Sequence, residues 1–262
     1  MQVFSTPEVA ARRLVAARRP DRAVAAFTCN VDHVMLTRAD RSFREAYGRA
    51  DVVTMDGAPV ALLSRWTGTP GAVRVTGVDI VAALGSVAAE QRLRMAIVGG
   101  APGRADRAGR ALADANPGLP RVLALSPSAG FPLGGPEDEA LVRALADLAL
   151  DVVVVCFGAP KQELWIDLHR DELPGAVLIG AGATVDYLSG AITRAPAVFQ
   201  RTGTEAFWRL GTEFPRLWRR YLLRDSPFLV LFAVTLARHH ARTAPAVPTP
   251  RPAADDVPEA AS

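Results

Sequence analysis

The sequence has little cysteine and no apolar run long enough to cross a membrane. Cys29 and Cys156 are the two cysteines among 262 residues, and each ends an apolar segment. This usage favours buried, reduced thiols over a disulfide and argues against a cysteine nucleophile. The apolar stretch from Phe228 to Ala237 is about half of the roughly 20 residues that a spanning helix needs, so we expect it to pack or to lie on a membrane.

Signals of metal and cofactor binding are also missing. The sequence has no Asp-x-Asp triplet and no His/Cys spacing typical of a metal site, so we predict neither a metal nor another cofactor. The glycines at Gly180 and Gly182 lack the full dinucleotide fingerprint, because Val185 stands where a third glycine belongs. The four histidines do not cluster with a Ser or Cys nucleophile, and we expect each on the surface or on a helix.

The ends of the chain differ from its middle. The first 23 residues lack the apolar core of a signal peptide, and we expect a short amphipathic helix there, capped by Ser5 or Thr6, in a protein that is not exported. The formal net charge is only +3, yet arginines crowd the segment from Arg194 to Arg224. This distribution predicts a basic patch near the C-terminus.

Between the ends, short apolar strands alternate with helices. The predicted strands span residues 22–29, 51–55, 93–98, 121–125, 152–157 and 175–179. Predicted helices span residues 31–39, 41–49, 59–66, 78–89, 104–115 and 136–150, with another opening at 161. This rhythm predicts an α/β fold, a Rossmann-like doubly wound and mainly parallel sheet, over residues 1–196.

The stretch from Asp151 to Glu163 is the most informative. Four consecutive valines indicate a strand buried on both faces, and the turn Gly158-Ala159-Pro160 leads directly into a helix. Lys161, Gln162 and Glu163 therefore open a helix at the carboxyl edge of the sheet, where such folds bind ligands. Helix N-termini attract phosphate, so we predict an anionic substrate such as a nucleotide diphosphate; a strand followed by a solvated helix cap is the alternative.

Polar residues follow other strands of the same predicted sheet. Thr28 and Asn30 come after one strand, and Asp56 and Arg74 lie at or near the end of another. A carboxylate beside amide and cationic groups can take a proton from an acceptor while an anionic leaving group is held. The Gly-rich turn at Gly99-Gly100 is a weaker signal of phosphate approach to the backbone.

Beyond residue 196 the pattern changes to helices, predicted over 205–223 and 227–240 in an appendage that spans 197–242. Arg209, Arg216 and Arg219 recur at helical spacing, with aromatic residues between them. This arrangement favours an interfacial element that docks on anionic lipid. A basic helix that packs its aromatics on the sheet domain is the alternative. Residues 243–262 are rich in Pro, Ala and acidic residues, and this composition predicts a disordered tail.

Taken together, these motifs resemble the WecG/TagA/CpsF glycosyltransferases (glycosyltransferase family twenty-six), in the family's order and over about residues 4–232. They are Thr28-x-Asn30, Met55-Asp56-Gly57, Arg74-Val75-Thr76-Gly77-x-Asp79, Gly99-Gly100, Gly158 to Glu163, Gly180-x-Gly182 and Arg194-Ala195-Pro196. The resemblance implies an inverting, metal-independent hexosyltransferase that moves N-acetylmannosamine, its uronic acid, glucuronic acid or a similar hexose. The implied donor is a UDP-sugar, and the implied acceptor is a polyprenyl-diphosphate-linked sugar in cell-surface polysaccharide or teichoic acid synthesis.

The resemblance also implies roles for individual residues. Asp56 would be the general base, and Arg209, Arg216 and Arg219 would bind the lipid diphosphate. The expected substrate-binding residues are Thr28, Asn30, Gly57, Arg74, Gly99, Gly100, Gly158, Pro160, Lys161, Gln162, Glu163, Gly180, Gly182 and Asp186. We expect a cytoplasmic protein, peripheral on the inner face of the cell membrane, that binds no nucleic acid; self-association is left open.

Two further functions stay open at this point. One is a nicotinamide-dependent oxidoreductase that uses Gly180 and Gly182. The other is a non-catalytic scaffold that binds membrane or nucleic acid through the arginine-rich segment.

Overall fold

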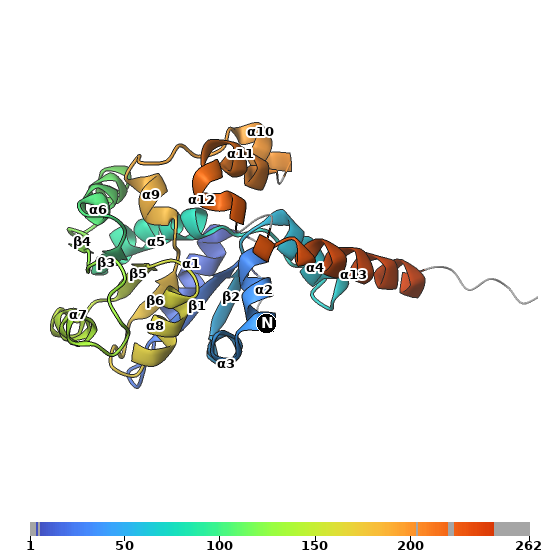
Figure 1. Ribbon diagram of the computed structural model, residues 1–262. Helices are drawn as coiled ribbons and strands as arrows, with labels where there is room; N and C mark the ends of the chain where they lie inside the picture. Colours follow the sequence, from blue (N-terminus) through green and yellow to red (C-terminus); the bar gives the residue numbers. More distant parts are fainter. Residues whose placement is uncertain (1–3, 5, 203, 220–222, 244–262) are drawn as a thin grey trace, which may run out of the picture.

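The computed structural model in Figure 1 describes residue 4 and residues 6–202, 204–219 and 223–243. The tail predicted to be disordered falls outside the described residues, apart from its first residue.

A single sheet of six parallel strands forms the centre, in the order β2-β1-β6-β5-β3-β4. The strands are β1 Val24–Cys29, β2 Val52–Met55, β3 Met95–Gly99, β4 Leu123–Leu125, β5 Val152–Cys156 and β6 Val177–Gly180. Most are runs of apolar, often β-branched side chains, because a parallel sheet in an α/β fold is covered on both faces. The predicted α/β class and parallel sheet are confirmed.

Helices cover both faces of the sheet (Figure 1). They are α1 Pro7–Ala16, α2 Val31–Ala39, α3 Arg41–Arg49, α4 Ala58–Trp66, α5 Gly77–Gln91, α6 Arg104–Ala115, α7 Pro136–Asp147, α8 Lys161–His169 and α9 Thr184–Leu188. Strand β5 shows how the sequence supports both layers. Val152 and Val154 belong to the core shared with α1, α5, α6 and α9, whereas Val153 and Val155 belong to the core shared with α3, α7 and α8. Successive side chains of a strand point to opposite faces, so the valine run builds both cores.

The C-terminal segment is helical, as predicted, but it is more broken than its periodicity suggests. It consists of α10 Ala197–Thr202, α11 Glu205–Thr212, α12 Phe214–Arg219 and α13 Pro227–Thr243. The single helix predicted from residue 205 is wrong: Glu213 leaves the helical conformation at φ −119° and ψ 29°. Pro215 follows at the second position of α12, where a proline is tolerated, but within a continuous helix its ring would clash with the preceding turn.

In Figure 1, α10, α11 and α12 gather over one end of the sheet, while α13 runs out to the side along α4. Within the part of the chain that the structure describes, no helix is both long and apolar enough to span a membrane.

Candidate active site

A cavity of about 1250 Å³ opens at the carboxyl edge of the sheet, beneath the C-terminal helices. Its walls come from the loops after β1, β2, β3, β5 and β6 and from α11, α12 and α13. Small-molecule sites measure about 300–1,000 Å³, so this cavity is larger than the usual site for one drug-sized ligand. Eleven of the predicted site residues line it: Thr28, Asn30, Asp56, Gly57, Arg74, Gly100, Gly158, Gln162, Gly182, Asp186 and Arg209.

Asp56 follows β2 directly and is fixed from two sides. Its backbone N–H donates to Cys29 O at 2.7 Å, and its carboxylate Oδ2 accepts from the backbone N–H of Gly77 at 3.4 Å. Gly57, with φ 135°, turns the chain into α4 immediately afterwards, a conformation that side chains other than glycine rarely adopt.

The electrostatic surroundings of Asp56 change its acidity. Burial is the main cause that raises the pKa of Asp56, to about 6. The Gly77 hydrogen bond and the charges of Arg209 and Arg74 oppose this rise, while the charge of Glu205 adds to it. A carboxylate with a pKa near 6 is mostly ionised at neutral pH, yet it is a better base than an ordinary aspartate.

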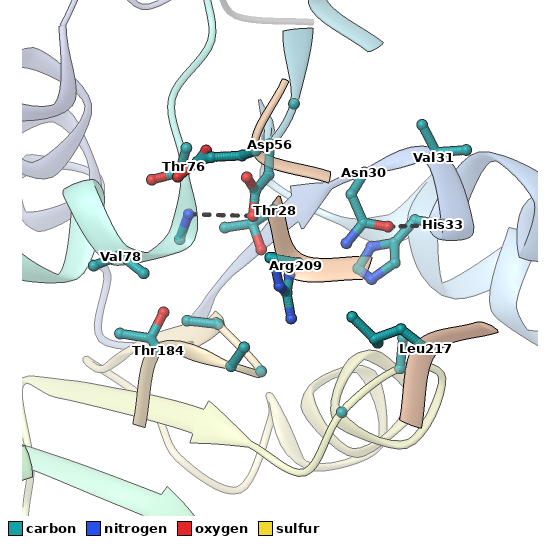
Figure 2. Close-up of a pocket in the computed structure, with 18 of the residues that line it drawn as sticks. Thr28, Asn30, Val31, His33, Asp56, Thr76, Val78, Thr184, Arg209 and Leu217 are labelled. Atoms are coloured by element: carbon teal, nitrogen blue, oxygen red, sulfur yellow. Dashed lines mark hydrogen bonds between the residues drawn. The ribbon is translucent and has the colours of Figure 1, made fainter. Parts of the chain in front are cut away.

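Thr28 and Asn30 line the cavity beside Asp56 (Figure 2) and also hold the local backbone. The Thr28 hydroxyl donates to Gly180 O at 2.8 Å, which joins β1 to β6 at the cavity floor. The side-chain oxygen of Asn30, Oδ1, accepts from the backbone N–H of His33 at 3.2 Å and caps α2.

Gln162 connects two glycine loops of the cavity. Its side-chain oxygen accepts from the backbone N–H groups of Gly158, at 3.1 Å, and Gly182, at 3.0 Å. Its amide nitrogen donates to Glu163 Oε1 at 2.7 Å. A Cβ at Gly180 would stand 3.2 Å from both Gln162 Nε2 and Glu163 Oε1, so this glycine makes room for the protein's own side chains. Val185 is buried, and its methyl groups lie 3.0 and 3.1 Å from a Cβ built at Gly100. Gly100 and Gly180 therefore make room for side chains of the protein itself, which gives no support to a dinucleotide-binding turn.

Other predicted site residues do not line the cavity. Lys161 points away from it: its ammonium group donates to Phe131 O and lies 3.2 Å from the centroid of the Phe131 ring. Gly99 approaches β5 so closely that a Cβ would lie 2.6 Å from Cys156 O. Also outside the lining are Pro160, Glu163, Gly180 and Arg219. Arg216 lies on α12, but its side chain falls outside what the structure describes.

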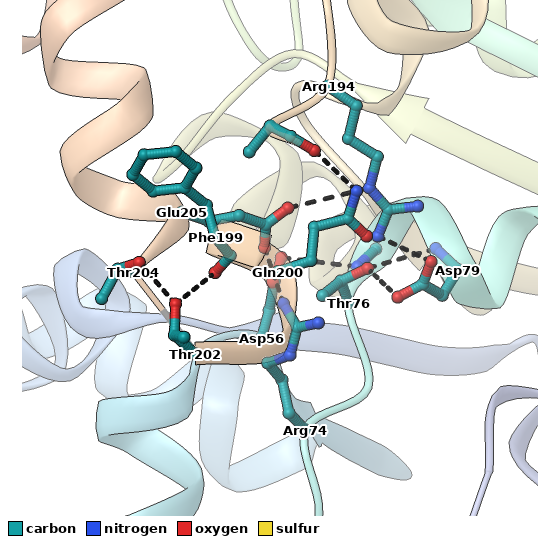
Figure 3. Close-up of polar contacts among 12 residues, drawn as sticks. Asp56, Arg74, Thr76, Asp79, Arg194, Phe199, Gln200, Thr202, Thr204 and Glu205 are labelled. Atoms are coloured by element: carbon teal, nitrogen blue, oxygen red, sulfur yellow. Dashed lines mark hydrogen bonds and ion pairs between the residues drawn. The ribbon is translucent and has the colours of Figure 1, made fainter. Parts of the chain in front are cut away.

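An ion-pair network ties α11 to the segment between α4 and α5 and to the first turn of α5 (Figure 3). Glu205 at the start of α11 accepts a hydrogen bond from Arg74 at 2.6 Å and lies 3.7 Å from Arg194 Nε. Arg194 also pairs with Asp79 at 2.7 Å, and Asp79 accepts from the hydroxyl of Thr76 at 2.7 Å. Arg74 is 131 residues from Glu205, so this connection between the sheet domain and the appendage could not be read from local sequence.

Glu205→Gln should loosen α11. The amide keeps the shape of the side chain but removes the charge that Arg74 and Arg194 share, and hydrogen bonds to charged groups contribute about 1.5–3 kcal/mol each. We expect a melting temperature lower by a few degrees and faster amide hydrogen exchange over α11. Glu139→Gln is the matched control, because its pair with Arg143 is exposed and 3.6 Å long. Equal exchange in the two variants would contradict this assignment.

Arg209 lies one turn after Glu205 on α11 and extends into the cavity near Asp56 (Figure 2). Its Nε is 3.3 Å from Glu213 Oε1, and its guanidinium carbon lies 5.7 Å from the centroid of the Tyr187 ring. Because α11 is anchored through Glu205, the position of Arg209 follows from the same ion pairs.

Sequence reasoning missed several residues of the cavity. His33, expected on the surface or on a helix, is indeed on α2, but it is buried and shares a 2.5 Å hydrogen bond with the Tyr47 hydroxyl. Arg104, at the start of α6, lines the cavity and forms an ion pair with Asp186 of α9. Arg224 reaches back to Asp32 on α2 at 2.6 Å. His33 stands three residues after Asn30, the N-cap of α2. This capping spacing was the one sequence signal that could have placed His33 in the first turn of α2, beside Asn30.

The cysteines behave as predicted. Cys29 and Cys156 are free and buried, and burial raises the pKa of each thiol to about 12. Both therefore stay protonated and weakly nucleophilic at neutral pH. Among the described residues, no group of three or more His, Cys, Asp or Glu side chains is arranged to hold a metal ion.

Comparison with known proteins identifies the family. Residues 1–242 match the model of the Glycosyl transferase WecG/TagA/CpsF family. A relative from Bacillus spizizenii is 32% identical over 174 residues, which are 66% of this chain and 65% of that protein. A relative from Bacillus subtilis is 29% identical over 74% of this chain and 73% of its own length, and one from Staphylococcus aureus (strain NCTC 8325 / PS 47) is 24% identical over 73% of each.

All three relatives bear one name, N-acetylglucosaminyldiphosphoundecaprenol N-acetyl-beta-D-mannosaminyltransferase. The match to the family's model covers nearly the whole chain, and the cavity is lined by the motifs on which the resemblance was based. The chain belongs to the WecG/TagA/CpsF family of glycosyltransferases.

Proposed function

We propose that this protein transfers a hexose from a UDP-sugar to a hydroxyl of a polyprenyl-diphosphate-linked sugar, with inversion at the anomeric carbon. The observation that carries the proposal is Asp56, a half-buried carboxylate with a raised pKa in a cavity lined by arginines. Family membership and the names of the relatives support the same reaction class.

Asp56 supplies the base. It takes the proton of the acceptor hydroxyl as that oxygen forms its bond to the anomeric carbon. The bond between the anomeric carbon and the donor diphosphate breaks on the opposite side, and UDP leaves with the bonding electrons. One displacement of this kind inverts the anomeric centre.

Arginines stabilise the departing diphosphate in this proposal. Arg74, Arg194 and Arg209 line the cavity around Asp56, and each is paired with a carboxylate in the structure. Each guanidinium has five N–H donors, so a diphosphate can bind these arginines while their carboxylate pairs stay in place. Lys161 has no part in this step, because it is held at Phe131.

The relatives' names favour N-acetylmannosamine as the sugar and N-acetylglucosaminyl diphosphate on a polyprenyl chain as the acceptor. The test is UDP release from a panel of UDP-sugars, measured with and without that acceptor, with the product identified by mass. N-acetylmannosamine, its uronic acid and glucuronic acid belong in the panel. Acceptor-dependent release with one donor supports the proposal. No release with any pair would favour a binding scaffold.

We also propose that the protein works at the cytoplasmic face of the membrane, held there by its C-terminal helices. The outer side of α13 exposes Leu229, Val230 and Val234, at 71%, 67% and 42% of their surface. Arg238 lies exposed further along the same helix. An apolar side with basic residues near it is typical of a helix that lies in a lipid interface.

A double substitution, Val230→Glu with Val234→Glu, should abolish co-flotation with vesicles that contain anionic lipid. Two carboxylates on this side of α13 would be repelled by the lipid and costly to bury. Leu168→Glu is the control, since Leu168 is 54% exposed on α8, away from the appendage. A chain that ends before residue 201 should also stay in solution. If that shortened chain still floats, the appendage does not dock.

A further inference from the structure

The lining of the cavity has two chemically different parts. Asp56 and the arginines around it form the polar part. The apolar part consists of Pro59, Leu62, Leu217, Phe228, Leu229 and Phe232, from α4, α12 and α13. A nucleotide-sugar needs the first kind of surface and gains little from the second.

Aromatic rings from two helices pack against one another at the apolar part. The ring centroids of Phe228 and Phe232 lie 5.9 Å apart, those of Phe232 and Trp66 lie 5.0 Å apart, and Trp66 stacks on His239 at 5.8 Å. These rings come from α4 and α13, the two helices that pack side by side. The rings of Phe228 and Phe232 also line the cavity, together with Pro59 and Leu62 of α4. We call this apolar part of the cavity, between α4 and α13, the apolar groove.

The cavity wall also contains a cation close in sequence to the apolar residues of α13. Arg224 lines the cavity four residues before Phe228, and its side chain is 44% exposed. Its Nε lies 2.6 Å from Asp32 Oδ1 on α2, which fixes the guanidinium in the wall of the cavity. A guanidinium has five N–H donors, so an anion can bind it while Asp32 stays paired.

We propose that the groove between α4 and α13 binds the hydrocarbon chain of the acceptor next to its diphosphate, and that Arg224 contacts the diphosphate itself. This inference rests on the proposed function. It follows from the chemistry of one cavity lining, which combines a base, a cation at Arg224 and an apolar groove. A polyprenyl-diphosphate sugar presents a hydroxyl, a diphosphate and a hydrocarbon chain, one group for each.

The groove also leads to a suitable exit. Leu229 lines the cavity and is 71% exposed, so it belongs both to the groove and to the outer side of α13. A chain too long for the groove can continue from Leu229 along this apolar side toward the bilayer. The groove therefore recognises only the first isoprene units of the acceptor.

Two water-soluble acceptors test the groove without a membrane. Both carry N-acetylglucosaminyl diphosphate, one on a geranyl chain and the other on an ethyl group. For the wild type we expect kcat/KM to be at least tenfold higher with the geranyl acceptor, through a lower KM, because about eight more carbons are buried. Equal kcat/KM for the two acceptors would overturn the proposal.

Substitutions locate the effect. The geranyl preference is the ratio of kcat/KM for the geranyl acceptor to kcat/KM for the ethyl acceptor. Phe232→Ser and Leu62→Ser should each reduce it to about twofold or less. Melting curves of both variants check that each is folded. Val230→Ser, on the outer side of the same helix, should keep the preference. Arg224→Gln should weaken both acceptors several-fold and leave their ratio unchanged. A preference that survives in both folded groove variants, or that is lost in Val230→Ser, would place the hydrocarbon elsewhere.

Calorimetric binding of the same two acceptors separates this inference from the proposed function. Tighter binding of the geranyl compound by the wild type and not by Phe232→Ser, without transfer of any sugar, would support the groove and reject the reaction. Equal binding of the two compounds would reject the groove, whatever the turnover. A change of oligomeric state in Phe232→Ser with an unchanged geranyl preference would show that the groove instead holds a second copy of the chain.

Discussion

Asp56→Asn is expected to lower turnover by about a hundredfold or more, the usual scale for loss of a general base, while the donor still binds. Asparagine fills the same space and can still accept from the backbone N–H of Gly77. It cannot take up the acceptor proton. Single-turnover rates with a lipid-linked acceptor measure the loss, and calorimetric titration with UDP checks that binding is retained.

Asp79→Asn is the matched control, because Asp79 is a nearby carboxylate that does not line the cavity. Its carboxylate pairs with Arg194 and accepts from Thr76, so its loss should cost at most a few-fold in rate. Wild-type turnover in Asp56→Asn would mean that another group takes the proton.

The same aspartate should set the acidic limit of the pH profile. A base works only when it is deprotonated, and the pKa of Asp56 is raised to about 6, chiefly by burial. We therefore expect kcat/KM of the wild type to fall tenfold for each pH unit below about 6. A limb near pH 4 would indicate an ordinary, solvated carboxylate.

A raised pKa also has a consequence for stability. The folded chain holds a proton on Asp56 up to about pH 6, whereas the ordinary pKa is 3.8. The stabilising contribution of this proton is complete below 3.8 and is lost as the pH rises through 6. The difference corresponds to roughly 3 kcal/mol as an upper bound. Asp56→Asn should therefore melt a few degrees higher than the wild type at pH 7.5, and the gain should shrink toward pH 4.

Local patterns in the sequence were enough to predict the sheet. The four valines of β5 fit only a strand covered on both faces, and the polar residues after β1 and β2 do meet at one edge. Those patterns work because the periodicity of a strand and the parallel order of the sheet constrain every side chain in the same way.

The details of the site depend on contacts between distant segments, which local patterns do not contain. Lys161 opens a helix at the expected edge, but the Phe131 ring and carbonyl group hold its ammonium group outside the cavity. Nothing near Glu205 in the sequence indicates that it pairs with Arg74, and this pair helps to hold α11 over the sheet domain. Sequence reasoning thus placed the backbone of the site better than its charges.

Arg209→Gln is the second change with a large expected effect, a loss of about a hundredfold in kcat, which is typical for removal of one charged donor from a transition state. Arg209 enters the cavity from α11 and favours the ionised form of Asp56. Its removal should act twice, since the departing diphosphate loses a guanidinium and the pKa of Asp56 rises further. The acidic limb of the residual activity should therefore move to higher pH.

Arg219→Gln tests whether the rate loss in Arg209→Gln comes from the position of Arg209 or from the lower net charge of the appendage. Arg219 is an exposed cation on α12, 5.3 Å from the centroid of the Trp218 ring, and it does not line the cavity. With a water-soluble acceptor we expect a far smaller loss than for Arg209→Gln and no shift of the acidic limb. Arg209→Lys should recover only part of the rate, because a lysine cannot bind a phosphate through two parallel hydrogen bonds. Equal losses in the two glutamine variants would mean that the appendage acts through its overall charge, and Arg209 would then have no specific role beside Asp56.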